Sequence, residues 1–458
     1  MQTPYLKNLL QKLTAMGLET LELLKFHQRQ SFSQITTKLC QTILQLKGEA
    51  SSSAIAEEIL RHFQSASDDD KKRFFQYLYA NLGADTKRVA KAITHYQATG
   101  TQEALQALAI AGEPQRLELF RTLNTAPQGT IALISMREDL YKLMSKENEF
   151  NLLDQELLSL FRTWFNRGFL ELRRIDWQTP AIILEKLIQY ESVHAIKGWT
   201  DLRRRLERDR CCYGFFHPAI PDVPLIFVEA ALNNTISNNI AALLLQTTPT
   251  DLPIKVDTAV FYSINNCLLG LRGVSFGNFL IKKVVEHLTS VQPEIKNFVT
   301  LSPVPGFMYW LRSFNNLKTV LSVDEADAVT KLLASNVISK ELRSNLLMEK
   351  ILTRLCAYYL VLVKNQDKPA DAVARFHLGN GARLERINWM ADSSDNGIKQ
   401  AAGMMVNYVY DKNTLALNHE AYEYQHKVAY STDVQKYLPK KDQQKFIAPH
   451  LALKNTTK

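Results

Sequence analysis

Two residues of this sequence, a serine and a histidine, have side chains suited to proton transfer. Ser302 closes the apolar run KNFVTLS at 296–302 and precedes a proline, and His377 lies within RFHLGNG at 375–381. A hydroxyl and an imidazole within hydrogen-bond reach can act as nucleophile, general acid or general base. A serine before proline is also an ordinary turn residue, and a histidine in an apolar stretch is also an ordinary core residue, so both alternatives stay open here. A Ser-His-Asp hydrolase is disfavoured, because Ser302 lacks the glycine-flanked nucleophile elbow.

A glycine-bearing turn precedes Ser302 in the chain. The turn, GLRGVSFGN at 270–278, lies between a β-branched and aromatic run at 257–265 and an amphipathic stretch at 279–288. These patterns predict a strand, a turn and a helix. The unpaired N–H groups and the dipole at the start of such a helix favour a pyrophosphate. The turn lacks the GxGxxG and GK[ST] nucleotide-binding patterns, and a purely steric role for its glycines stays open.

Residues 1–160 carry the pattern of an all-helical domain. No proline occurs between Pro4 and Pro114, and the glycines in that span stand roughly where helices would stop. Ser67, followed by three aspartates, is a strong helix N-cap and precedes an amphipathic stretch that ends at Leu82. We therefore expect a helical bundle over residues 1–160.

The pattern changes near residue 160, where prolines become frequent and strands are expected. β-rich runs occupy 223–232, 257–265, 296–302, 383–390 and 402–410, and an amphipathic segment at 235–246 separates the first two. Helices mixed with a sheet predict an α/β domain over residues 161–458. The expected fold class is a multidomain α+β chain: a helical domain at 1–160, then an α/β domain.

The composition is that of a globular chain with a net positive charge. Its 458 residues are 46% hydrophobic and 22% charged, with a formal charge of +9. The basic residues are mostly scattered, so we expect no nucleic-acid partner, and no apolar run is long enough for a membrane span. The one dense cluster, which we interpret as solvated or structural, contains Arg203, Arg204, Arg205, Arg208 and Arg210. An excess of cations still suits a multiply phosphorylated ligand such as coenzyme A.

The cysteines do not form a metal or disulfide pattern. Cys40, Cys211, Cys212, Cys267 and Cys356 are odd in number and lack paired spacing. We therefore expect no metal site and a reducing compartment. The N-terminal stretch has no apolar signal core, so the expected location is the cytoplasm.

Several motifs together resemble the malonyl-CoA decarboxylase family over nearly the whole chain. They are WFNRGFLELRRIDW at 164–177, VHAIKGWTDLRRRL at 193–206, PLIFVEAAL at 224–232, FYSINNCLLGLRGVSFGNFLIKKVV at 261–285, LSPVPGF at 301–307 and FHLGNGARLERINWMAD at 376–392. The turn also resembles the Arg/Gln-x-x-Gly-x-Gly/Ala pyrophosphate loop of acetyltransferase-like enzymes, with Ser275 where its first glycine usually sits. The resemblance implies a helical domain used in oligomerisation, a C-terminal acetyltransferase-like (GNAT) domain, and conversion of malonyl-CoA to acetyl-CoA and CO2.

The resemblance also implies site residues. The family's catalytic serine, described as a proton acceptor, falls on Ser302, and its catalytic histidine, expected to protonate the nascent carbanion, falls on His377; both would also contact the substrate. The family's malonyl-CoA phosphate loop falls on Arg272, Gly273, Val274, Ser275, Phe276, Gly277 and Asn278. No metal or separate cofactor is implied, because the thioester is the electron sink. Relatives form tetramers, so a homotetramer is expected.

Two other functions stay open. An acyl-CoA-dependent N-acyltransferase would share the coenzyme site but need a pocket for an amine, whereas a non-catalytic acyl-CoA sensor would need neither Ser302 nor His377. Backbone N–H groups at 264–266 are candidate oxyanion donors. Tyr408 and Tyr410 are candidates for the border of the acyl cleft, although strand tyrosines usually serve packing.

Overall fold

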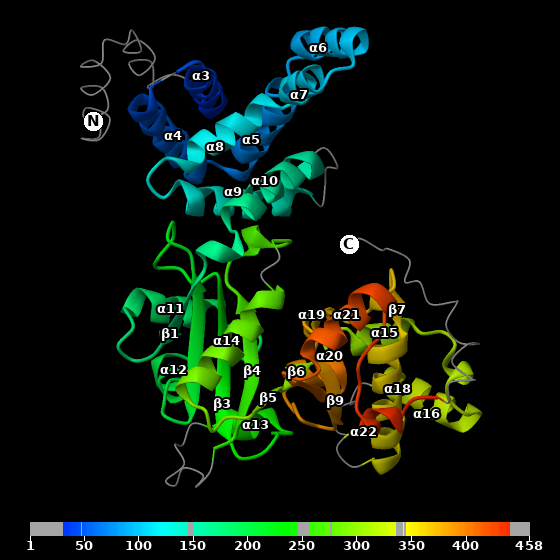
Figure 1. Cartoon of the computed structure of the whole chain (residues 1–458). Coiled ribbons are helices and arrows are strands. Elements are labelled where there is room, and N and C mark those ends of the chain that lie inside the picture. The colour runs from blue at the N-terminus through cyan, green and yellow to red at the C-terminus, as the bar shows by residue number, and fades with distance from the viewer. Residues whose placement is uncertain are drawn as a thin grey trace.

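The computed structural model describes residues 31–46, 48–144, 150–245, 256–274, 277–335, 342 and 345–439. Its N-terminal part is helical, as predicted, and lies above the sheet in Figure 1. The helices are α3 (Phe32–Gln45), α4 (Glu49–Gln64), α5 (Asp68–Asn81), α6 (Thr86–Thr99), α7 (Gln102–Ala111), α8 (Gln115–Asn124), α9 (Gly129–Met144) and α10 (Phe150–Trp164). Helices α9 and α10 form the side of this region that faces the sheet (Figure 1).

Helix α5 illustrates how local sequence sets these elements. The Ser67 side chain accepts a hydrogen bond from the Asp70 N–H, which satisfies a donor that the helix itself leaves unpaired. The apolar residues then fall on one face, where Phe74, Phe75 and Leu78 are buried. The predicted domain boundary near residue 160, between a domain at 1–160 and one at 161–458, stays a prediction.

The C-terminal part contains a mixed sheet. Its strands are β1 (Glu171–Ile175), β2 (Arg210–Phe216), β3 (Ile226–Asn233), β4 (Thr258–Asn266), β5 (Asn297–Thr300), β6 (Ser302–Pro303), β9 (Arg383–Asn388) and β10 (Met405–Val409). They are ordered β1-β2-β3-β4-β5-β10-β6, and β9 also pairs with β10. All five predicted runs contain strands, with bounds that differ by a few residues, and the run at 296–302 is divided between β5 and β6. Strands β1 and β2 were not predicted; β2 is buried along its whole length, so it lacks the alternation of a half-exposed strand.

Strands β4 and β5 pair in parallel and then separate. Their pairing runs from Thr258 opposite Asn297 to Phe261 opposite Thr300, and the Leu301 N–H still donates to the Phe261 carbonyl. Strand β4 continues to Asn266, whereas the other strand turns away into β6. The register between β3 and β4 also shifts at Tyr262. The two strands therefore splay apart beyond Phe261 and Thr300.

Helices cover both faces of this sheet. Alternate residues of a strand point to opposite faces. On β4, Phe261 belongs to the same core as Leu280 of α14 (Gly277–Val291), whereas Val260 and Tyr262 pack with α13 (Ile240–Leu243). Helix α13 is much shorter than the amphipathic segment predicted at 235–246, within which residue 246 lies outside the described ranges. Helices α11 (Ala181–Tyr190) and α12 (Trp199–Arg205) precede β2.

A long helical insertion separates β6 from β9. It contains α15 (Phe307–Ser313), α16 (Val323–Ala334), α18 (Leu346–Leu362) and α19 (Ala372–Gly379), with the short hairpin β7 (Lys364–Asn365) and β8 (Lys368–Pro369). The last elements are α20 (Asp395–Ala401), α21 (Leu415–Gln425) and α22 (Thr432–Gln435). Figure 1 shows these elements beside the open side of the splayed strands. Across the described ranges, no helix combines the length and apolar character that a membrane crossing needs.

Candidate active site

Ser302 and His377 lie in direct contact. The Ser302 Oγ is 3.0 Å from the Nε2 of His377, and both residues are buried. The serine lies on β6, which pairs with β10, and its hydroxyl donates to the Thr300 Oγ1 at 2.9 Å. The two sequence candidates are separated by 75 positions, so only the fold brings them together.

A single carboxylate connects the segments that carry the two residues. Asp371 caps α19 by accepting hydrogen bonds from the N–H groups of Val373 and Ala374, each at 2.9 Å. Its other oxygen accepts from the N–H of Gly306, in the turn that follows Ser302. Helix α19 and this turn are therefore held in one arrangement.

Tyrosines surround the imidazole of His377 on its other sides. Its Nδ1 is 2.7 Å from the hydroxyl of Tyr410, and the Tyr408 ring stacks on it with centroids 4.6 Å apart. Burial lowers the pKa of His377 from 6.5 to about 3, so the ring is neutral near pH 7. Burial also raises the pKa of Tyr410, which therefore keeps its proton. If the Tyr410 hydroxyl donates to Nδ1, the proton of the neutral ring is on Nε2 and faces Ser302.

A cavity of ≈340 Å³ opens beside this pair between the splayed strands. Its lining consists of Val193, Ile226, Phe261, Tyr262, Ser263, Ile264, Asn266, Leu280, Ser302, Pro303, Ala372, Val373, Phe376 and His377. None of these lining residues is Asp, Glu, Lys or Arg. A carboxylate placed here would meet neutral donors and apolar walls. Ile264 and Asn266 lie at the cavity, and the role of their N–H groups as oxyanion donors stays a prediction.

The predicted phosphate loop adjoins this cavity at the start of α14. A 3-10 turn at Leu269–Leu271 leads to Arg272 and Gly273, which are exposed, and Gly273 has a φ of 88° that glycine adopts without strain. Val274 is half-buried, and Ser275 and Phe276 lie outside the described residues. Gly277 and Asn278 form the first turn of α14, and Leu280 from the same turn lines the cavity.

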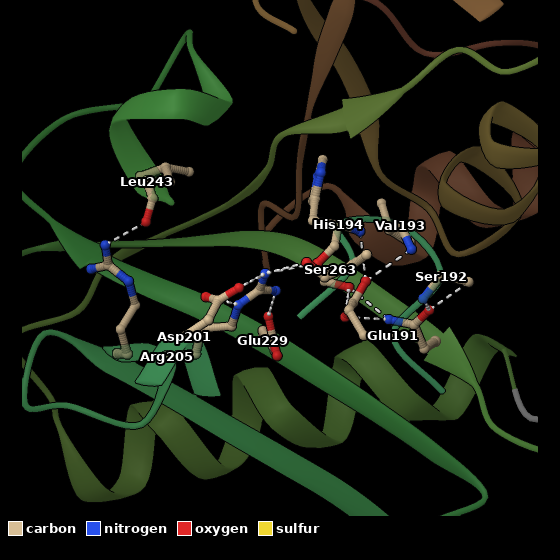
Figure 2. Close-up of polar contacts among 12 residues, drawn as sticks. Glu191, Ser192, Val193, His194, Asp201, Arg205, Glu229, Leu243 and Ser263 are labelled. Carbon is tan, nitrogen blue, oxygen red and sulfur yellow. Dashed lines mark hydrogen bonds and ion pairs between the residues drawn. The ribbon is translucent and has the colours of Figure 1, made fainter. Parts of the chain in front are cut away.

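The arginine cluster is largely structural, and two of its five members stay exposed. Arg204 and Arg210 are buried against Asp209, with nitrogen–oxygen distances of 2.7 Å, whereas Arg203 and Arg208 are exposed. Arg205 is buried between Asp201 and Glu229, at 3.1 and 3.0 Å (Figure 2).

Another carboxylate, Glu191, connects this network with the cavity, because Arg205 donates to the His194 carbonyl and the His194 N–H donates to Glu191. Its Oε2 accepts from the Ser263 hydroxyl at 2.6 Å and from the Asn265 amide at 2.7 Å, and Ser263 lines the cavity (Figure 2). Its Oε1 accepts from the N–H groups of Val193 and His194. Burial raises the pKa of the neighbouring Glu229 to about 7.

The sequence did not point to a role for Glu191 or for the side chains of Ser263 and Asn265, and it indicated Tyr410 only as a candidate for the border of the acyl cleft. A usable signal existed for two of them, because Ser263 and Asn265 place polar side chains on one face of an otherwise apolar strand. No spacing in the sequence connects Glu191 with that strand, 72 positions away.

Comparisons with known proteins give one consistent result. The family model described as "Malonyl-CoA decarboxylase C-terminal domain" matches residues 168–448, and the N-terminal domain model matches residues 82–165. "Malonyl-CoA decarboxylase, mitochondrial" of Anser anser anser is 34% identical over 399 residues, which are 80% of this chain and 79% of that protein. The mouse protein of the same description is 35% identical over 67% of this chain and 68% of its own length.

Solved structures give the same result. The crystal structure of malonyl-CoA decarboxylase from Rhodopseudomonas palustris matches with a TM-score of 0.82 and 43% identity, covering 88% of this chain and 99% of that one. The corresponding structure from Cupriavidus metallidurans matches with a TM-score of 0.70 and 35% identity, covering 89% of this chain and 99% of that one.

Proposed function

Because the chain belongs to the malonyl-CoA decarboxylase family, we propose that it converts malonyl-CoA to acetyl-CoA and CO2 at the cavity beside Ser302 and His377. The bond between the α-carbon and the carboxylate breaks, and its electron pair moves onto the thioester oxygen as an enolate. A proton then adds to the α-carbon. One proton is consumed in each turnover, and His377 supplies it.

The 3.0 Å contact between Ser302 and His377 at the wall of a cavity without charged lining carries this proposal. A carboxylate loses its charge when it leaves as CO2, so poor solvation of that carboxylate favours the transition state over the bound substrate. The Ser302 hydroxyl orients the leaving carboxylate, and apart from His377 the neutral walls leave its charge uncompensated. Backbone N–H groups at 264–266 receive the enolate oxygen.

His377 acquires its proton when the substrate binds. A neighbouring negative charge favours the protonated imidazole, so the arriving carboxylate counteracts the burial that holds the free enzyme's ring neutral. Departure of CO2 removes this charge and makes the imidazolium a stronger acid at the moment when the carbanion forms. Tyr410 holds the Nδ1 side of the ring, so the Nε2 side faces the substrate.

The turn at 270–278 holds the coenzyme A phosphates, which lie at the N-terminus of α14. The residues assigned to this role are Arg272, Gly273, Val274, Ser275, Phe276, Gly277 and Asn278. We assign no metal and no separate cofactor to the reaction, because the thioester accepts the electron pair. The cytoplasm is our proposed location, in keeping with the free and buried cysteines at positions 40, 211, 212, 267 and 356, and a homotetramer is the proposed assembly, to be measured by light scattering.

The test supplies malonyl-CoA without any acyl acceptor and follows acetyl-CoA and CO2. The parent protein is expected to turn over, whereas Ser302→Ala and His377→Asn are expected to lose kcat by roughly 10²- to 10⁴-fold. A folded parent that forms no acetyl-CoA would eliminate the decarboxylase. Full turnover by both variants would leave the reaction but remove these two residues from it.

A further inference from the structure

The helical N-terminal region contacts the proposed phosphate loop directly. Arg137 of α9 is 1% exposed, and its Nη1 donates to two carbonyls of the loop, that of Gly270 at 2.7 Å and that of Arg272 at 2.9 Å. Its Nε donates to Asp154 of α10 at 2.7 Å. Asp154 therefore holds the Arg137 guanidinium within the helical region, and the Nη1 of the same group binds the loop.

Other side chains of α9 and α10 contact the same short turn. Glu138 accepts a hydrogen bond from the Gly270 N–H at 3.0 Å, and Tyr141 donates to the Arg272 carbonyl at 3.3 Å. Arg162 of α10 donates to the carbonyl of Gly273, also at 3.3 Å. The loop backbone thus forms hydrogen bonds with four side chains of the helical region.

Steric contact adds to these hydrogen bonds. A Cβ at Gly270 would lie 2.1 Å from the carbonyl oxygen of Ile134, and one at Gly273 would lie 3.3 Å from Leu158. Gly270 therefore allows the loop backbone to approach α9 more closely than a side chain would permit, whereas Gly273 lies in tight contact with α10. The glycines of this turn serve its contact with the helical region as well as its proposed contact with phosphate.

We propose that the helical region supports the coenzyme A site from the side of α9, with Arg137 as a positioning residue that orients the phosphate loop. This inference rests on the proposed function, in which the loop binds the phosphates. Arg137 donates hydrogen bonds to the carbonyl oxygens on the side of the loop that faces α9. The loop's N–H groups are then kept in the orientation that a pyrophosphate needs, and the carbonyls of Gly270 and Arg272 are held away from the anion.

Arg116 offers a matched control. It is 3% exposed, pairs with Glu156 of α10 at 2.7 Å, and donates to the carbonyls of Leu78 and Tyr79 within the helical region. It therefore resembles Arg137 in burial and bonding, but its hydrogen bonds go to the helical region and not to the loop. Both arginines stabilise the helical region, whereas only Arg137 is predicted to affect the coenzyme.

The experiment compares Arg137→Met with Arg116→Met on two substrates, malonyl-CoA and malonyl-pantetheine, which lacks the phosphates. For malonyl-CoA, Arg137→Met is expected to raise KM by about tenfold or more with kcat within about twofold. For malonyl-pantetheine its kcat/KM is expected to match the parent's. Arg116→Met is expected to leave KM for both substrates unchanged at a temperature where the variant is folded.

An equal loss on both substrates, or an equal effect of the two arginine variants, would overturn the proposal. If Arg137→Met does not fold, Glu138→Ala replaces it, with Glu138→Gln as the conservative variant that keeps the acceptor for Gly270 and is expected to restore KM. Calorimetric binding of coenzyme A separates this inference from the reaction. Weaker binding by Arg137→Met supports the positioning role even if the parent fails to decarboxylate malonyl-CoA, and unchanged binding overturns it.

Discussion

Two buried polar clusters lie at the splayed strand β4, and they differ in charge and in access to the cavity. The cluster in Figure 2 is charged: Arg205 is held by Asp201 and Glu229, and Glu191 lies next to it. The cluster at Ser302 and His377 is neutral, because burial keeps the imidazole uncharged, and both residues line the cavity.

The difference follows from the cost of burying charge. An ion taken out of water is tolerated only when opposite charges and hydrogen bonds offset its lost hydration, and a group committed to such partners is poorly suited to bind a substrate. A neutral imidazole and a hydroxyl can be buried at much lower cost and can each accept or donate a further bond. The charged cluster therefore supports the floor of the site, while the neutral pair is suited to act on the substrate.

The largest predicted effect comes from a substitution that breaks the charged cluster. Arg205→Met leaves the carboxylates of Asp201 and Glu229 buried without their cation, and we expect a loss of about 3–5 kcal/mol in the free energy of unfolding. Urea denaturation measures it. The control, Arg208→Met, removes an exposed arginine from the loop that follows α12 and is expected to change stability by less than about 0.5 kcal/mol. Equal stability of both variants would contradict the supporting role of the network.

A smaller effect is expected at the neutral cluster of Ser302 and His377. Tyr410→Phe removes the hydrogen bond to Nδ1 of His377, and we expect kcat to fall by about tenfold with little change in KM. Tyr408→Phe is the control, because the Tyr408 ring stacks on His377 while its hydroxyl has no hydrogen-bond partner among the described residues. The control variant should keep the parent's kcat, and a matching loss in both variants would mean that the two hydroxyls act only through packing.

The smallest predicted effect concerns pH and stability. The folded state lowers the pKa of His377 from 6.5 to about 3, so below pH 6.5 the unfolded chain binds one proton more than the folded chain. Stability is therefore lost as pH falls, by about 1 kcal/mol from this residue between pH 7 and pH 5.5. Urea denaturation of the parent and of His377→Asn at the two pH values measures this contribution. The comparison separates the effect of His377 from that of His194, whose pKa is also lowered by burial. Identical pH dependence in the two proteins would show that His377 is solvated when folded.

Much of the architecture was predictable because it depends on local patterns. The N-cap at Ser67 and the apolar face after it determine α5, and the β-branched run at 257–265 determines β4. Strand β2 was missed because both of its faces are buried, so its sequence carries no alternation. The family resemblance indicated which positions of this chain correspond to the family's site residues, namely Ser302, His377 and the phosphate loop. Their catalytic and binding roles stay predictions.

The sequence by itself determined which residue types are available and where many of the helices and strands lie, since capping, periodicity and turn residues act over a few positions. Tertiary structure alone decided the partners: Tyr410 beside the imidazole, Glu191 beneath Ser263, and Arg137 against a loop 133 positions away. Hydrogen bonds of this kind depend on the relative placement of whole elements. That placement results from the packing of the entire core, and no short stretch of sequence encodes it.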